Sequence, residues 1–350
     1  MTFLQAILLQ CLQTVEGERT VYSVYHLLKG KKSSQTIQDA HLFSLKHLFK
    51  SYSQMDRAGF DRLMSELAGT GYIEERSLQR MAVTGKGREA LQDFWQSRKY
   101  PEHLNGWVYQ DASVLLWKRL TLFIQSLSHL INRDIRYMPV QRDPDVQHWI
   151  KEFFISYPGS RHQLADDTYN ELVRAFSKGC PDDPGLLVSR LSGYGRIGLT
   201  HAQAAELYGM EPTEFWYRQL NLLHFLTAAV SLRDREFPVL HAFVRDEVEP
   251  VPLTQSALST YRLLKESRTI EEIAAMRRLK KSTIEDHVIE ISLNDRSFAI
   301  DPFIARETAE QIRRIAKSVG GKRLKPIKDR MADVTYFQIR LALTKQGDGL

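Results

Sequence analysis

The sequence predicts a mainly α-helical fold in three segments, residues 1–98, 99–252 and 253–350. The first observation is that apolar residues recur at helical spacing in the runs between turn residues. The second is a boundary marked by the prolines of "EPVPLT". The third is a charge split, with 13 Lys/Arg against 10 Asp/Glu in the first segment, 16 against 19 in the second and 19 against 13 in the third. An acidic partner is therefore expected to meet the two terminal segments.

The first segment has the order of a winged helix. Its apolar start, "MTFLQAILLQCLQ", has one apolar helical face and no basic start, so it predicts a packed helix and not a signal peptide. A second helix ends at Gly30, a polar loop "KKSSQT" follows, and a later helix stops at Gly69 and Gly71. Two alternating runs, "GYIEE" and "LQRMAVT", then predict a hairpin, and another helix closes the segment. Helices followed by a hairpin are typical of a winged helix.

The stretch "LLKGKKSS" does not fit a phosphate-binding P-loop. That motif needs a glycine five residues before Gly-Lys-Ser/Thr, but position 25 is tyrosine and two lysines separate Gly30 from the serine. We therefore expect no ATP hydrolysis by this chain. The lysines instead suggest DNA-phosphate contacts, together with an arginine of the hairpin, and the alternative is a solvated loop. These residues are Lys29, Lys31, Lys32 and Arg76.

The middle segment is predicted to be helical and rich in aromatic residues. It holds four of the five tryptophans, which we interpret as core residues. The stretch "GLTHAQAAELYGMEPTEFWYRQLNLLHFL" has a helix-turn-helix outline, with Thr200 and Gln203 at capping-box spacing. Its second helix has Glu214 near the start and few basic residues, so we expect a scaffold and not a DNA reader.

The third segment contains a better specified helix-turn-helix, "RTIEEIAAMRRLKKSTIEDHVIEI". Thr269 and Glu272, and again Ser282 and Glu285, have capping-box spacing. Rotation of the second helix by 100° per residue predicts an open side that carries Ser282, Glu285, Asp286, Ile289 and Glu290. Three carboxylates without an arginine read base edges poorly.

That open side is therefore predicted to dock a protein through Asp286, Ile289 and Glu290. The alternative is that Ile289 is covered by the C-terminal helices, near Phe337 or Leu341. Downstream basic residues are the better candidates for DNA phosphates, the alternative being a solvated face. They are Arg313, Arg314, Lys317, Lys322, Arg323, Lys325, Lys328 and Arg330.

Catalytic and membrane functions find no support in the residue patterns. Two cysteines make neither a disulfide framework nor a zinc site, and no metal-ligand spacing or nucleophile set is apparent. We expect no catalytic residue, no cofactor and no metal, and hence no enzyme. The longest later apolar run, "LLHFLTAAVSL", is too short to span a bilayer, so we expect a cytoplasmic protein associated with the nucleoid.

Several motifs carry a resemblance to a known family. "YRLLKES", "TIEEIA", "RRLKKSTIEDHV", "LKPIKDR" and "YFQIRLALT" resemble, in order and spacing, the C-terminal helix-turn-helix domain of bacterial RecQ-type helicases. "YSVYHLLKGKKSSQT" and "MAVTGKGREAL" resemble the winged helix of those helicases. The whole chain resembles the YpbB family of Gram-positive bacteria.

The resemblance implies association with a RecQ-like helicase of the RecS type. The motor domains and the four-cysteine zinc module of such helicases are missing from this sequence. We therefore expect a non-catalytic accessory subunit that supplies protein- and DNA-binding modules in trans for DNA repair and recombination. DNA binding is expected to be mostly sequence-independent. The alternative is a helix-turn-helix transcription regulator that binds a specific DNA site.

Overall fold

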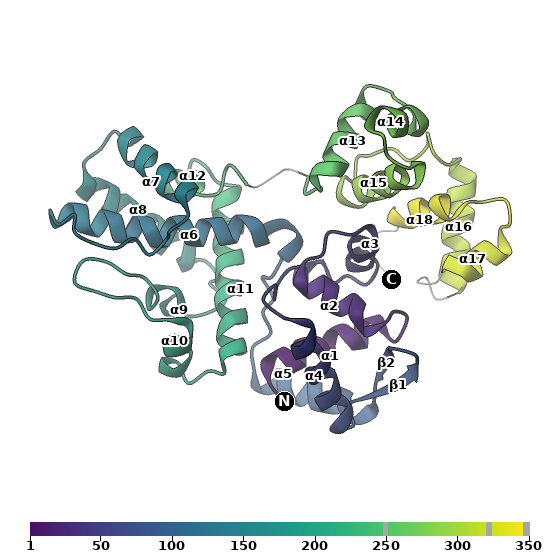
Figure 1. Ribbon diagram of the computed structural model, residues 1–350, viewed down its shortest axis with the longest axis horizontal. Helices are drawn as coiled ribbons and strands as arrows, with labels where there is room; N and C mark the ends of the chain where they lie inside the picture. The colour runs from purple at the N-terminus through teal and green to yellow at the C-terminus, as the bar shows by residue number, and fades with distance from the viewer. Residues whose placement is uncertain (248–250, 320–323, 346–350) are drawn as a thin grey trace. The chain divides into compact units, whose positions relative to one another are not determined.

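The structure, a computed structural model, describes residues 1–247, 251–319 and 324–345. The described residues form helices almost throughout, with one two-stranded antiparallel hairpin (Figure 1). This confirms the mainly α prediction. The elements are α1 Phe3–Val15, α2 Val21–Lys29, α3 Ser34–Leu42, η1 Lys46–Leu48, α4 Arg57–Gly69, β1 Ile73–Ser77, β2 Arg80–Val83, α5 Gly85–Ser97, α6 Gly106–Ile131, α7 Pro144–Ser156, α8 Arg161–Ser177, α9 Gly185–Val188, α10 His201–Leu207, α11 Pro212–Ser231, α12 Pro238–Ala242, α13 Gln255–Lys265, α14 Ile270–Arg277, α15 Lys281–Asn294, α16 Arg306–Ser318, α17 Leu324–Arg330 and α18 Tyr336–Thr344.

Contacts divide the described chain into two compact units. Unit 1 comprises residues 1–11, 46–74 and 83–247, and unit 2 comprises residues 12–45, 75–82 and those from 251 onward. Residues 1–98 contribute to both units, whereas the described part of 253–350 lies wholly in unit 2. The division into three continuous segments remains a prediction, because the two compact units are each built from separate pieces of the chain.

The N-terminal elements follow the predicted order of helices, hairpin and helix. Gly30 ends α2 with a φ of +78°, a conformation that glycine adopts without a steric penalty. The polar "KKSSQT" stretch was predicted as a loop throughout, and that is wrong for its second half. Ser33 caps α3 by accepting a hydrogen bond from the Thr36 amide (3.3 Å), so the helix begins at Ser34.

Unit 1 is organised around two long helices, α6 and α11, which pack on each other. Phe123 of α6 is fully buried and contacts Phe154 of α7 and Phe243. The predicted core tryptophans are half-buried: Trp117 and Trp149 pack against this apolar cluster. The Thr200–Gln203 capping box is present, and α11 is buried along most of its length, as a scaffold helix requires.

In unit 2 the predicted helix-turn-helix is formed by α14 and α15. The Thr269–Glu272 capping box is present. The second predicted box is wrong: α15 begins at Lys281, after Lys280, which makes no side-chain cap, so Ser282 lies inside the helix. Apolar side chains of both helices meet in one core, among them Ile273, Ile284 and Val288.

The predicted open face of α15 is closed in the structure. Helices α3, α13, α14 and α18 pack against α15, and Figure 1 shows it among its C-terminal neighbours. Ile289 is 2% exposed and shares an apolar cluster with Leu341, while Glu290 is 6% exposed. The expectation that Ile289 is exposed is therefore wrong, and the alternative, cover by the C-terminal helices, describes it better. Asp286, Ile289 and Glu290 do not offer an open docking surface.

Truncation of Ile289 tests this enclosure. Ile289→Ala removes buried methyl groups and leaves a cavity, so we expect a loss of about 3 kcal/mol, with about 1 kcal/mol for Ile289→Val. Guanidinium unfolding followed by far-UV circular dichroism measures both. Leu232→Ala, at a side chain that is exposed in unit 1, is the matched control and should change little. An unshifted transition for Ile289→Ala would show that Ile289 is not a core residue.

Candidate nucleic-acid interface

Helix α15 has one accessible end. Residues from His287 to Ser292 are all buried, and consecutive residues on a helix point in directions about 100° apart, so this stretch is covered on every side. Lys281 and Ser282, in the first turn, are exposed. In DNA-bound helix-turn-helix proteins the N-terminal residues of the second helix contact the DNA. The exposed end of α15 is therefore the end that such a contact would use.

The carboxylates of α15 are engaged inside unit 2. Asp286 accepts a hydrogen bond from Arg340 Nη1 of α18 (2.6 Å), and Arg340 Nε in turn donates to Gln38 of α3 (2.8 Å). Glu290 accepts from the Thr254 amide (2.5 Å) and the Thr254 hydroxyl (3.1 Å), which caps α13. Burial raises the pKa of the Glu290 carboxyl, although these hydrogen bonds oppose the shift. These two acids therefore hold neighbouring helices on α15 and do not face a DNA groove.

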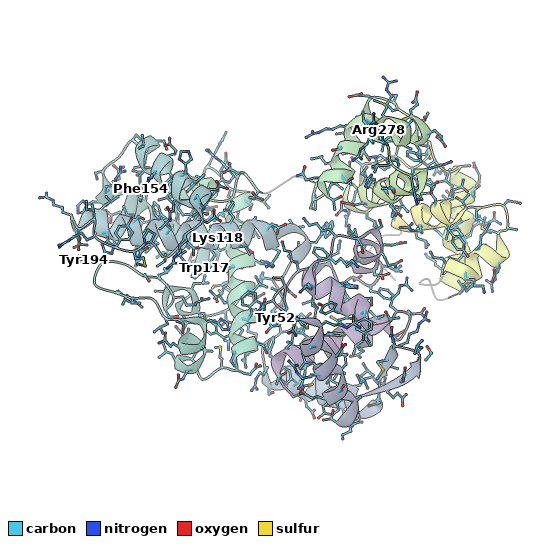
Figure 2. All side chains as sticks on the ribbon, viewed as in Figure 1. Tyr52, Trp117, Lys118, Phe154, Tyr194 and Arg278 are labelled. Carbon is cyan, nitrogen blue, oxygen red and sulfur yellow. The ribbon has the colours of Figure 1, made fainter. Side chains whose placement is uncertain are left out.

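The turn between α14 and α15 presents basic side chains. Arg278 adopts a φ of +53°, the left-handed conformation that ends α14. Arg278, Lys280 and Lys281 are exposed, and Figure 2 shows Arg278 at the edge of unit 2. Lys281 forms an ion pair with Glu271 (2.8 Å), and this partner raises its pKa. We call Arg278, Lys280 and Lys281 the basic turn.

A partly buried hydrogen-bond network supports the basic turn from behind. Arg277 donates to the Ser256 carbonyl (2.8 Å) and to the Thr260 hydroxyl. The same hydroxyl lies 2.8 Å from His287 Nδ1 of α15. Because Arg277 immediately precedes Arg278, these bonds to α13 fix the start of the turn. The position of the basic side chains thus depends on packing between α13, α14 and α15.

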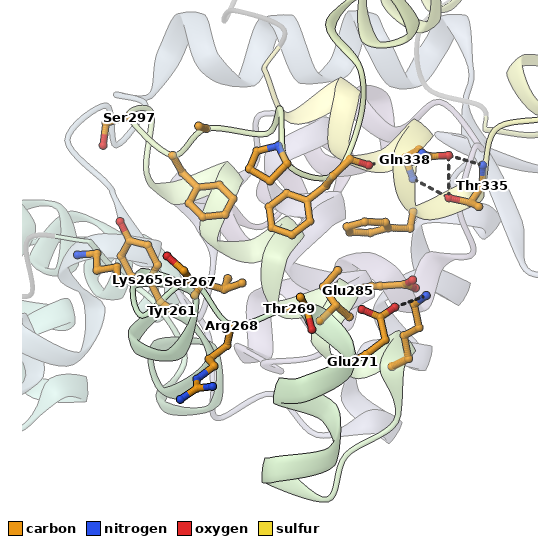
Figure 3. Close-up of a pocket in the computed structure, with 18 residues that line it drawn as sticks. Tyr261, Lys265, Ser267, Arg268, Thr269, Glu271, Glu285, Ser297, Thr335 and Gln338 are labelled. Carbon is orange, nitrogen blue, oxygen red and sulfur yellow. Dashed lines mark hydrogen bonds and ion pairs between the residues drawn. The ribbon is translucent and has the colours of Figure 1, made fainter.

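A groove of about 800 Å³ lies beside the basic turn (Figure 3). Aromatic rings form one side, with Phe298 and Phe303 stacked at 6.0 Å between ring centroids. Charged side chains of α13, α14 and α15 line the other side, among them Glu285, whose pKa is raised by burial. The lining residues of that side include Lys265, Arg268, Glu271 and Lys281. Aromatic faces next to cations can accept a flat unpaired base.

The basic residues predicted downstream divide into three groups. Arg314, Lys317, Lys325 and Arg330 are exposed on α16 and α17, and Arg313 is half-buried. Arg330 Nη1 donates to the Ser318 hydroxyl (3.0 Å). Lys328 donates to the carbonyls of Ala332 (2.6 Å) and Val334 (2.7 Å), so its ammonium closes the loop before α18. Lys322 and Arg323 lie outside the described residues. The first group keeps a geometry suited to phosphate contact.

The N-terminal candidates also lie in unit 2. Lys29, Lys31 and Lys32 are exposed around the turn between α2 and α3. The charge of Lys32 partly opposes the rise that burial causes in the pKa of Glu290. Arg76 is exposed on β1 of the hairpin. The hairpin tip is held to the start of α2, since the Val21 amide donates to the Gln79 carbonyl (2.9 Å). Every predicted DNA-contacting residue that the structure describes therefore belongs to the same unit as the helix-turn-helix.

Sequence reasoning missed the basic turn. Its residues lie in the stretch "RRLKKS". The rotation argument assumed that one whole side of the second helix is open, so it looked for contacts on that side and not in the preceding turn. The local pattern of α15 contains no sign that α3, more than 200 residues earlier, packs on it. Two basic pairs flanking Leu279 in a tight turn were the available signal.

Other side-chain clusters and long helices add little to the site. Among the described residues, no group of three or more His, Cys, Asp or Glu side chains is arranged to hold a metal ion. None of the helices within the described ranges is long and apolar enough to cross a bilayer.

Comparison with known proteins bears on the whole chain. A family model described as a helix-turn-helix domain matches residues 256–343, which confirms the predicted helix-turn-helix in this part of the chain. "Protein YpbB" of Bacillus subtilis (strain 168) is 33% identical over 355 residues, covering 99% of this chain and 98% of that protein. No solved structure matches.

The network behind the basic turn predicts a pH dependence. Burial, and then the positive charge of Arg277, lowers the pKa of His287 to about 4, while Asp286 opposes the shift. The unfolded chain takes up this proton near pH 6.5 and the folded chain resists it, so His287 contributes stability above pH 6.5 that is lost as pH falls towards 4. We expect a loss of about 1 kcal/mol per pH unit in that window.

His287→Gln should remove this part of the pH dependence. Urea unfolding midpoints between pH 7 and pH 4.5 measure it, with His162→Gln, at an exposed histidine of unit 1, as the control. His224, whose pKa burial lowers to about 3, adds its own acid sensitivity, so the variant is compared with the unaltered chain. If His287→Gln and the unaltered chain lose stability equally as pH falls, His287 is not the source of this pH dependence.

Proposed function

Because this chain belongs to the YpbB family and carries a helix-turn-helix domain, we propose that it is a non-catalytic, DNA-binding accessory protein of a RecQ-type helicase. It binds DNA mainly through phosphates, serves DNA repair and recombination, and acts in the cytoplasm at the nucleoid. The observation that carries the DNA-binding part is the basic turn, which occupies the exposed end of the second helix.

Electrostatics support phosphate binding at this turn. Three exposed cations stand within four consecutive positions, and the acids Asp286 and Glu290 are bonded internally. The acidic outer face expected on α15 is thereby reduced to Glu285, which is half-buried. Exposed Arg314, Lys317 and Lys325, and the lysines between α2 and α3, extend the set of candidate phosphate contacts in unit 2.

Burial of α15 favours binding without strong sequence preference. Base reading in a major groove uses several side chains along a helix that enters the groove. Here α15 offers Lys281 and Ser282 as exposed side chains, and its following turns are covered by neighbouring helices. A protein that holds DNA chiefly by its phosphates suits an accessory role, since a helicase must act at many sequences.

The helicase partnership rests on resemblance and on what the sequence holds. The C-terminal motifs resemble those of RecQ-type helicases, whereas motor motifs are missing from the 350 residues. This chain has modules that resemble the DNA-binding domains of a helicase but has no motor motifs. It would therefore supply those modules to a helicase that lacks them.

A second candidate function is a transcription regulator that binds a defined site. The helix-turn-helix match and the internal hydrogen bonds of Asp286 and Glu290 favour it. The limited exposure of α15 opposes it. Selection of random duplex DNA on the purified chain separates the two, because a regulator enriches a consensus and an accessory protein does not.

Loss of charge at the basic turn should weaken DNA binding by a salt-dependent amount. Arg278→Gln/Lys280→Gln should flatten the plot of log Kd against log salt by about one unit per lost phosphate contact. The measurement is fluorescence anisotropy with duplex DNA of unrelated sequences. Lys151→Gln/Lys178→Gln, at exposed lysines of unit 1, is the matched control. An unchanged slope in the turn variant would remove these residues from the interface.

The lysines between α2 and α3 make a separate prediction. Lys29→Ala/Lys31→Ala/Lys32→Ala should lower the same slope by about one unit for each lysine that touches a phosphate. Thermal stability is measured in parallel, since Lys32 lies near the buried Glu290. If slope and affinity are both unchanged, the loop is simply solvated.

The accessory role is tested by adding the chain to a purified RecQ-type helicase. We expect faster unwinding of forked DNA than with the helicase alone, less stimulation with Arg278→Gln/Lys280→Gln, and no ATP hydrolysis by the chain alone. The rate of strand separation is followed by fluorescence dequenching. A helicase that unwinds equally fast with and without the chain speaks against the partnership, whereas DNA binding is judged by the anisotropy assay.

A further inference from the structure

We propose that the C-terminal end of α6, in unit 1, is a docking surface for an acidic segment with bulky apolar side chains on a partner protein. The surface consists of Ile135, Met138, Tyr194 and Ile197, and we call it the α6-end patch. It is independent of the proposed DNA interface, all of whose described residues belong to unit 2.

All four side chains of the patch are large, apolar and exposed. Ile135 is 78% exposed, Met138 74%, Tyr194 50% and Ile197 90%. Single exposed apolar residues are ordinary on a protein surface, but contiguous ones mark sites where another molecule binds. The four side chains come from two loops, one between α6 and α7 and one between α9 and α10.

The first loop is held to α6 by side-chain hydrogen bonds. Gln125 of α6 accepts from the Val140 amide (2.9 Å) and donates to the Met138 carbonyl (3.1 Å). The Tyr137 hydroxyl donates to Ser126 (2.8 Å). The Asp134 amide donates to the His129 carbonyl (3.1 Å), so the backbone is fixed on both sides of the exposed Ile135 and Met138.

The second loop is held to the same end of α6. The Tyr194 amide donates to the Ser128 hydroxyl (2.8 Å), and Gly193 and Arg196 exchange backbone hydrogen bonds (2.9 and 3.0 Å) around a tight turn. The ring of His129 lies 4.4 Å from the ring of Tyr137 and 5.7 Å from that of Tyr194. His129 therefore contacts both loops at the end of α6, and Figure 2 shows Tyr194 at the margin of unit 1.

This rigidity separates the patch from a mobile loop that exposes apolar residues by chance. Side chains whose backbone is already ordered lose less conformational freedom on binding, so their apolar area contributes more fully to affinity. The hydrogen bonds that order both loops leave the four side chains themselves outside.

The charge around the patch identifies the partner's chemistry. Residues 133–143 and 190–197 contain five arginines and two aspartates, in a middle segment whose balance is acidic overall. Arg133, Arg136 and Arg196 are exposed, and Arg142 Nη2 lies 4.0 Å from the sulfur of Met138. Asp143 forms an ion pair with Lys118 (2.9 Å), while Asp134 pairs with Arg136 (3.6 Å). An apolar surface with a rim of arginines complements a segment that alternates acidic and bulky apolar residues.

A designed peptide tests the proposal on the full chain. The probe is fluorescein-labelled DDLDEFLDDI, compared with the acid-only DDSDESSDDS and the charge-reversed KKLKRFLKKI. We expect DDLDEFLDDI to bind tightest, and Met138→Ser/Ile197→Ser to weaken it about tenfold or more through lost apolar burial. Arg136→Ser/Arg196→Ser should weaken it mainly at low salt. Ile155→Ser, at an α7 isoleucine that is 76% exposed, is the matched control and should bind normally.

Four results would overturn the proposal. In the first, DDLDEFLDDI binds the unaltered chain no tighter than either comparison peptide does. In the second, it binds the Met138→Ser/Ile197→Ser variant as tightly as it binds the unaltered chain. In the third, sedimentation shows that the unaltered chain self-associates and that this double variant does not, which would assign the patch to a second copy of the chain. In the fourth, the double variant no longer binds duplex DNA, which would assign the patch to nucleic acid. Because the substituted side chains are exposed, thermal stability should be unchanged, and anisotropy with DNA on the same variants tests the proposed function separately.

Discussion

The enclosure of α15 is the constraint on which the account of unit 2 depends. A second helix of a helix-turn-helix is usually open on the side that faces DNA. Here α3, α13, α14 and α18 cover it, and residues 287–292 are buried in succession. A helix surrounded in this way must satisfy its polar side chains internally, because an unpaired buried carboxylate is costly. Asp286 and Glu290 are satisfied by Arg340 and Thr254, and these bonds hold α18 and α13 in place.

Enclosure also decides where the helix-turn-helix itself can meet a polyanion. With the sides of α15 covered, contact is left to its first turn and to the loop before it, where Arg278, Lys280 and Lys281 are exposed. The hydrogen bonds of Arg277 and His287 to Thr260 place this loop. Unit 1 contributes a different kind of surface, apolar with an arginine rim at the end of α6. The two units thus carry the two proposed interactions, phosphate contact in unit 2 and protein docking in unit 1.

Local sequence signals predicted local structure well. Capping residues such as Thr269 and Thr200, and the glycine at position 30, mark the real ends of helices. The apolar alternation around Ile73 and Met81 predicted the hairpin. What failed was the assignment of helix faces. Ile289 follows the solvent-side register of an amphipathic helix, yet it is buried, because the cover on that side comes from elements distant in sequence. Periodicity records the contacts within a helix pair and carries no information about a third layer. The same limit hid the basic turn and the joining of two loops by His129.

The central claim is that DNA contacts the basic turn. Lysine acetylation followed by mass spectrometry tests it directly, since a phosphate that covers an ammonium slows its reaction. With saturating duplex DNA, Lys280 should react markedly more slowly than in the free chain, while Lys151 and Lys178 of unit 1 should react at the same rate in both. If the DNA is bound and Lys280 reacts as fast as in the free chain, DNA lies elsewhere and the account of the basic turn is contradicted.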